Sequence, residues 1–302
     1  MRRTPRAVAL SLCLLAAVSC EGAQADVGDV VHSSVALARV QRLAQRRADS
    51  ATTTDHSAPL AQWLLPHALQ EISGLALTSD GRLLTHDDEV GQVWEIDYRS
   101  GAVVKRFGLG AGDIHGDFEG MAVANDAIYM LTSRGKLYEF AEAANGARAD
   151  YDVYDTGLAR ACEFEGVAFD RAANSLLFAC KLVLNAASRD SLVIYRWRLD
   201  SDSATRISRL AIGVAGVLAA NGWKALHPSD ITVDPLTGNY VLLASAESAI
   251  MSVTPAGEVV FARALPARHH QPEGIAITKD SILIISDEAG KRPAIITLYR
   301  WP

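Results

Sequence analysis

Acidic residues recur at matched positions of a repeated pattern. The segments EISGLAL (71–77), DFEGMAV (117–123), EFEGVAF (163–169), HPSDITV (227–233) and QPEGIAI (271–277) align on Gly74, Gly120, Gly166, Asp230 and Gly274. One shared position then holds Glu71, Asp117, Glu163, His227 and Gln271, and the position two residues later holds Ser73, Glu119, Glu165, Ser229 and Glu273. Because side chains two apart in a strand point to the same face, we expect both sets to form two stacked polar rings.

Carboxylates that converge in one place repel one another, and some stay protonated unless a cation is present. Calcium suits such a group because it takes roughly six to eight oxygen ligands in flexible geometry. Zinc fits less well, since the histidines show no HxxxH or HxH spacing. The predicted calcium ligands are Glu71, Glu119, Glu165, Glu273, Asp87 and Asp287, and the predicted channel-lining residues are Asp117, Glu163, His227 and Asp230. The alternative is that these residues face a wet channel and bind nothing specific.

The elements that must position these residues are short strands. The aligned anchors are 46, 46, 64 and 44 residues apart, and each is followed by a turn and a second apolar run. A repeated four-stranded unit of about 40–50 residues is typical of a propeller blade. We therefore predict an all-β fold, a five-bladed β-propeller of four-stranded antiparallel blades over residues 59–302, with six blades as the alternative. Residues 59–70 are expected to supply an outer strand that closes the ring, and the long interval is expected to hold an extended loop.

The N-terminus predicts export. Three arginines within the first six residues precede an apolar run, which ends in small residues before Cys20. This is typical of a secretory signal over residues 1–19, and its end resembles a lipobox that would make Cys20 the lipidated first residue of a membrane-anchored envelope protein. Cleavage after Ala25 into the periplasm is the competing interpretation. Residues 20–58 are predicted to be a tether, with one candidate helix at 33–47.

The net charge limits the classes of binding partner, and the cysteine content bears on whether a disulfide forms. Removal of residues 1–19 takes away three arginines and no acids, so the net charge moves from −6 to −9. With no basic patch, nucleic acid is excluded as a partner. The mature chain keeps Cys162 and Cys180. If their segments form a hairpin, the two cysteines are diagonal neighbours close enough for a disulfide, and two free thiols are the alternative.

The ordered set of segments, from EISGLAL to the final ISDE, resembles the SdiA-regulated family of bacterial propellers over roughly residues 60–302. The resemblance implies a five-bladed propeller, distantly related to NHL-repeat and phytase-like propellers, with a calcium site. The positions that match are Glu71, Glu119, Glu165 and Glu273. The fourth repeat departs from the pattern, because Ser229-Asp230 stands where the others have acid-glycine. The family has no established activity.

Two functions are compatible with these residues. The first is a cell-envelope calcium-binding propeller, in which calcium stabilises the blades and one face presents loops to an unknown protein or small-molecule ligand. The second is a calcium-dependent hydrolase of the lactonase or phosphoesterase type, in which a ring carboxylate acts as the base. The chain has no GxSxG and no Ser-His-Asp set that sequence logic can join, so no catalytic residue is assigned.

Overall fold

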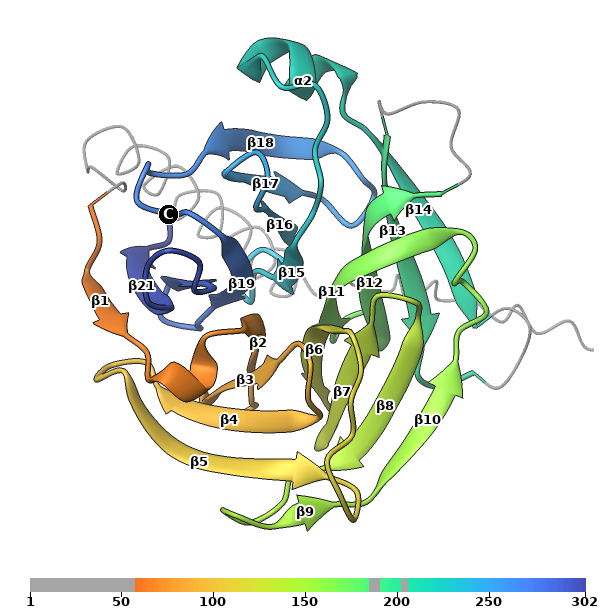
Figure 1. Ribbon diagram of the computed structural model, residues 1–302. Coiled ribbons are helices and arrows are strands. Elements are labelled where there is room, and N and C mark those ends of the chain that lie inside the picture. Colours follow the sequence, from red (N-terminus) through yellow and green to blue (C-terminus); the bar gives the residue numbers. More distant parts are fainter. Residues whose placement is uncertain (1–57, 185–190, 202–205) are drawn as a thin grey trace, which may run out of the picture. The chain divides into compact units, whose positions relative to one another are not determined.

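The computed structural model describes residues 58–184, 191–201 and 206–302. In this part of the chain, five antiparallel sheets are arranged around a central axis as the blades of a propeller (Figure 1). The predicted all-β, five-bladed architecture is confirmed. The predicted signal segment, the tether, its candidate helix and Cys20 lie outside the described residues.

Four strands make up each blade, and the innermost strand carries the aligned segment. The innermost strands are β2 (Ile72–Leu77), β6 (Phe118–Ala124), β11 (Cys162–Asp170), β15 (Asp230–Val233) and β19 (Pro272–Ile277). The second strands are β3 (Leu83–Asp87), β7 (Ala127–Thr132), β12 (Ser175–Val183), β16 (Tyr240–Ala244) and β20 (Ile282–Asp287). The third strands are β4 (Gln92–Asp97), β8 (Lys136–Ala141), β13 (Ser191–Arg198), β17 (Ala249–Val253) and β21 (Ile295–Arg300). The outermost strands are β5 (Ala102–Leu109), β10 (Tyr151–Asp155), β14 (Ile207–Gly213), β18 (Val259–Ala264) and β1 (Ala61–Leu64).

The ring is closed by a strand from the other end of the described chain. β1 pairs antiparallel with β21, so that Ala61 faces Leu298 and the last blade gains its outermost strand. This pairing covers an edge that would otherwise be free. A short 3-10 helix, η1 (His67–Leu69), leads from β1 into the first blade, and β9 (Arg148–Ala149) adds a short parallel strand to β5.

The long interval between the third and fourth anchors includes helix α2 (Ala215–Asn221), which lies between β14 and β15. None of the helices in the described ranges is long and apolar enough to cross a membrane. The apolar core lies between neighbouring blades. In the cluster between blades two and three, for example, Leu131 of β7 belongs with Phe164 of β11 and Trp197 of β13.

Around the axis the innermost strands touch through their backbones. A Cβ atom on Gly120 would lie 2.6 Å from the backbone nitrogen of Val167 and 2.7 Å from the Cα atom of Gly166. One on Gly166 would lie 2.8 Å from the Cα atom of Asp230. Four of the five anchors are therefore glycine, because a side chain does not fit where the blades approach so closely. We call this set of contacts the axial belt.

Candidate functional site

Three glutamates are each the extra residue of a β-bulge. In β6, Phe118 and Gly120 pair with consecutive residues of β7, which leaves Glu119 without a partner in the ladder. Glu165 in β11 and Glu273 in β19 occupy the same position relative to their neighbours. A bulge bends its strand and re-aims the extra side chain. Strict alternation is thus interrupted at these residues, and the bulges set the direction of the glutamates.

One of the three glutamates contacts an ammonium group, and the charges of the other two act on the same group. Lys181, near the end of β12, places its Nζ atom 2.5 Å from Oε1 of Glu165, which is only 7% exposed. Burial lowers the pKa of Lys181, but the hydrogen bond to Glu165 and the charges of Glu165, Glu119 and Glu273 outweigh it, so that the pKa is raised. Lys181 is therefore charged. We call Glu119, Glu165 and Glu273, together with Lys181, the carboxylate cup.

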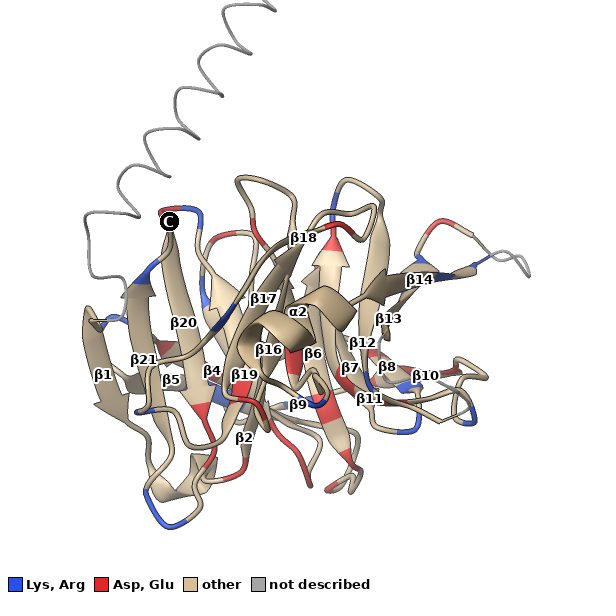
Figure 2. Cartoon of the chain, turned by 90° about the horizontal axis from the view of Figure 1, so that it is seen from above, with Lys and Arg blue, Asp and Glu red and all other residues tan. Residues whose placement is uncertain are grey.

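One ammonium does not neutralise the acids of the cup. Burial, followed by the charges of Glu165 and Asp117 and a hydrogen bond with Asp117, raises the pKa of Glu119 to about 9. Burial and the charge of Glu165 raise the pKa of Glu273 to about 7. The cup therefore retains protons near neutral pH, because its single ammonium group cannot balance the charge of three carboxylates. Figure 2 shows acidic segments near β6 and β11.

A second acidic group joins blades one and five. Burial and a hydrogen bond with Glu71 raise the pKa of Glu288 to about 8. The side-chain amide of Gln271 donates a further hydrogen bond to Glu288. Burial and the charges of Asp87 and Glu71 raise the pKa of Asp88 to about 6, and its Oδ1 atom is buried without a hydrogen-bond partner among the described residues.

Two predicted calcium ligands are occupied by local hydrogen bonds. Asp87 accepts two backbone N–H groups of its own turn at 3.0 Å. Asp287 accepts the backbone N–H of His270 at 2.9 Å and bonds to Nδ1 of His269 at 2.6 Å. His269 is buried, and its Nε2 atom lies 2.6 Å from the hydroxyl of Tyr299. The structure thus brings Glu119, Glu165 and Glu273 together and places Asp87 and Asp287 in turn-forming networks.

Of the predicted channel-lining residues, Asp117 and Glu163 act on the cup and His227 does not. Asp117 accepts a hydrogen bond from the Ser133 hydroxyl, and its charge acts on Glu119 and Glu165 at the cup. Burial raises the pKa of Glu165 against the opposing effect of Lys181, and the charge of Glu163 adds to the rise. His227 bonds through Nδ1 to Oε1 of Glu247 at 2.8 Å, within blade four.

Asp230 belongs to the axial belt. It is fully buried, and its carboxylate accepts the backbone N–H groups of Ile231 and Ile275 at 2.8 Å each. The N–H of Leu75 lies 3.5 Å away. Burial raises the pKa of Asp230 well above its usual range, against the opposing effect of these N–H groups. The one non-glycine anchor therefore joins blades four, five and one through buried hydrogen bonds.

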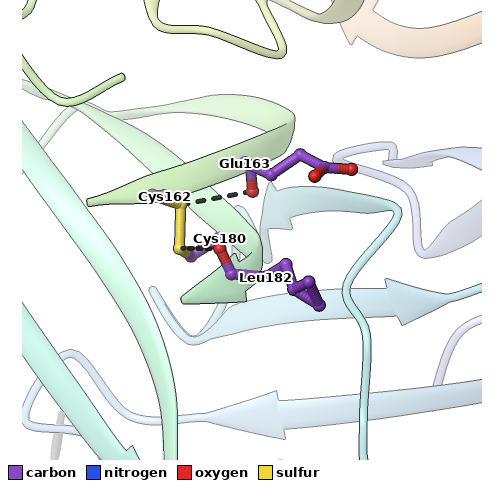
Figure 3. Close-up of a disulfide and its surroundings, with 4 residues drawn as sticks. All are labelled: Cys162, Glu163, Cys180 and Leu182. Atoms are coloured by element: carbon purple, nitrogen blue, oxygen red, sulfur yellow. Dashed lines mark hydrogen bonds between the residues drawn. A yellow bond between two sulfur atoms is a disulfide. The ribbon is translucent and has the colours of Figure 1, made fainter. Parts of the chain in front are cut away.

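A disulfide holds the hairpin that carries half of the cup. Cys162 and Cys180 are bonded across β11 and β12, with their Cα atoms 5.7 Å apart (Figure 3). Their sulfur atoms contact the carbonyl oxygens of Glu163 and Leu182. Cys180 directly precedes Lys181 in one strand, and Cys162 lies three residues before Glu165 in the other. The bond therefore restrains the strand ends that present both charges.

The residues of the cup fit a hard cation in their donor chemistry. All of its acceptors are carboxylates, which are the ligands that calcium prefers. In the described ranges, no group of three or more His, Cys, Asp or Glu side chains is already arranged to hold a metal ion. Glu165 is paired with the ammonium of Lys181 instead, so metal binding requires these side chains to move.

Comparison with known proteins identifies a family. The family model described as SdiA-regulated matches residues 48–289. No curated protein matches the chain. Among solved structures, the chain is similar to glutaminyl cyclase of Myxococcus xanthus, with a TM-score of 0.53, 13% identity, and coverage of 80% of this chain and 94% of that one.

Two further solved structures match the chain with lower TM-scores. Aldose sugar dehydrogenase of Streptomyces coelicolor has a TM-score of 0.48 and 13% identity, with coverage of 80% of this chain and 99% of that one. A Bacteroides caccae protein of unknown function has a TM-score of 0.40 and 13% identity over 68% of this chain, which spans 64% of that protein's length. At such identities the similarity concerns the fold alone.

Proposed function

This chain belongs to the SdiA-regulated family, and from its carboxylate cup we propose that it is a calcium-binding propeller of the cell envelope. The observation that carries the proposal is the convergence of three bulged glutamates, from blades two, three and five, on a single ammonium. Glu119, Glu165 and Glu273 would hold the ion, with Asp117 beside them. Calcium would supply the positive charge that the cup lacks and would link three blades near the axis.

Isothermal titration of calcium into protein stripped with a chelator tests this proposal. We expect one equivalent to bind more tightly than millimolar, within the range of calcium sites in proteins. Glu119→Gln and Glu273→Gln each remove a ligand charge and should weaken binding about tenfold or more. Asp152→Asn is the matched control, because this acid is exposed on β10. Failure of the wild type to show saturable binding tighter than millimolar would rule out the calcium site.

The envelope location rests on separate support. The basic and apolar N-terminus has the form of an export signal, and a disulfide is compatible with an oxidising compartment. Mass spectrometry of the mature protein from its native host is expected to find a lipidated Cys20 at the N-terminus and the protein in the membrane fraction. Cys20→Ser should release the protein into the soluble fraction. A mature N-terminus at Asp26 would contradict the lipid anchor and indicate a soluble periplasmic protein.

A further inference from the structure

A large basin opens among the turns that follow the innermost strands. Its volume is about 2060 Å³, and residues of all five blades line it. Three positions after each anchor, every innermost strand has an apolar residue, and these form a ring in the basin: Leu77, Val123, Phe169, Val233 and Ile277. The first four are partly exposed. Apolar side chains left open to solvent inside a concave surface are typical of a ligand site.

Blade three brings two guanidinium groups to this basin, which Arg82, Arg99 and Lys279 of blades one and five also line. Arg171 follows β11 and sits 5.7 Å from the ring centroid of Phe169, and Arg196 of β13 sits 5.6 Å from that of Tyr240. Neither forms an ion pair with a carboxylate of the described residues. Arg196 donates hydrogen bonds to the carbonyl of Pro255 and to the Tyr240 hydroxyl, and its Nε atom is buried without a partner in this part of the chain. Within the described ranges, these two positive groups thus have no anionic partner.

Two acidic residues of blades three and four that line the basin already accept hydrogen bonds from other side chains. Asp170 accepts a hydrogen bond from the Tyr240 hydroxyl at 2.6 Å. Asp234 accepts one from Nε1 of Trp301 at 3.1 Å and one from the Thr237 hydroxyl at 2.7 Å. The exposed acids of the basin, at positions 80, 126 and 280, belong to the turns of blades one, two and five. Blade three therefore contributes two arginines to the basin that are not paired with a carboxylate of the described residues.

We propose that this basin binds an amphipathic organic anion. The apolar body of the ligand contacts the ring that includes Val123, Phe169 and Val233, and the anionic head pairs with Arg171 and Arg196. A planar guanidinium bonds to a carboxylate or a sulfonate through two parallel N–H groups, which a lysine does not offer. The site is distinct from the carboxylate cup, whose charge would repel the same ligand.

Calorimetric titration with dodecanoate below its critical micelle concentration tests the assignment, with dodecyltrimethylammonium as a probe of the same chain length and opposite charge. We expect one equivalent of dodecanoate to bind, and the ammonium probe to bind at least about tenfold more weakly. Arg171→Gln and Arg196→Gln should each weaken dodecanoate binding severalfold. Arg209→Gln, at an exposed position of β14, is the matched control and should leave it unchanged.

Three results would overturn the proposal: no saturable binding of dodecanoate, equal binding of both probes, or undiminished binding in the Arg171→Gln variant. Arg171 is exposed in a turn, so its replacement is expected to preserve the fold, and thermal unfolding verifies this. Repeating the titration in excess chelator separates the basin from the cup. Dodecanoate binding should be unaffected by the removal of calcium.

Discussion

The Nζ atom of Lys181 lies 2.5 Å from Oε1 of Glu165, so the cup contains a cation supplied by the protein itself. The side chain of Lys181 is 40% exposed, and it extends from β12, in the same blade as Glu165. An incoming divalent ion must share the glutamates with this ammonium or displace it. The ion pair therefore sets the affinity of the cup for any external cation.

Replacement of Lys181 by methionine should increase calcium affinity. The change removes a positive charge in direct contact with Glu165 and keeps most of the aliphatic side chain. We expect the dissociation constant to fall about tenfold or more. Calorimetry measures this, and Lys136→Met, on the exposed side of β8, is the control. Unchanged or weaker binding would show that Lys181 does not compete with the metal.

The calcium-free protein should lose stability as pH rises. The pKa values of Glu119, Glu288 and Glu273, about 9, 8 and 7, lie above the ordinary value of 4.5. For acids shifted upward, the contribution to stability is fully present below about pH 4.5 and is lost as pH passes through the folded-state values. In chelator, the melting temperature is therefore expected to fall between pH 5 and pH 9, and calcium should reduce the fall.

Circular dichroism melts of the wild type and Glu119→Gln measure this effect. The glutamine has no charge to gain, so its melting temperature should decline less between pH 7 and pH 9 than that of the wild type. Parallel pH profiles for the two proteins would contradict the assigned role of Glu119.

The sequence predicts the blades better than it predicts the site. The spacing of anchors such as Gly120 and Gly166 identifies the innermost strands, because the crowded axis admits glycine and little else. The bulge at Glu119 leaves no comparable signal, since one extra residue does not change the local pattern of apolar residues. The role of Lys181 depends on the register between β11 and β12, and charge pairing across a hairpin cannot be read from spacing alone.

The axial belt provides a sharp test of backbone packing. In Gly120→Ala, the new Cβ atom would meet backbone atoms of Val167 and Gly166 at 2.6 and 2.7 Å, and backbone gives way less easily than a flexible side chain. We expect a loss of about 1–3 kcal/mol or more in the free energy of unfolding, measured with urea. Gly213→Ala in β14 is the matched control, because nothing lies within 4 Å of its Cβ position. Equal stability of the two variants would contradict the close approach.

Replacement of Asp230 by alanine should destabilise the ring. The change leaves the N–H groups of Ile231 and Ile275 buried without their acceptor, at a cost of about 1–3 kcal/mol for each group. Asp230→Asn keeps one carbonyl oxygen and should lose less. Urea unfolding compares both with Asp152→Ala, a change at an exposed acid. An alanine variant as stable as the wild type would show that these hydrogen bonds do not hold the blades together.

The disulfide between Cys162 and Cys180 should support both the fold and the cup. The cysteines are 18 residues apart, and closing a loop of this size contributes about 2–4 kcal/mol, mainly by restraining the unfolded chain. The double variant C162A/C180A is expected to unfold at a lower urea concentration than the wild type, and dithiothreitol should not change its unfolding midpoint. Reduction of the wild type with dithiothreitol should lower its midpoint toward that of the variant. Calcium binding should also weaken, because the bond restrains the strand ends that carry Glu165 and Lys181. A wild type whose unfolding is unchanged by dithiothreitol, with both thiols shown to be reduced, would contradict this role.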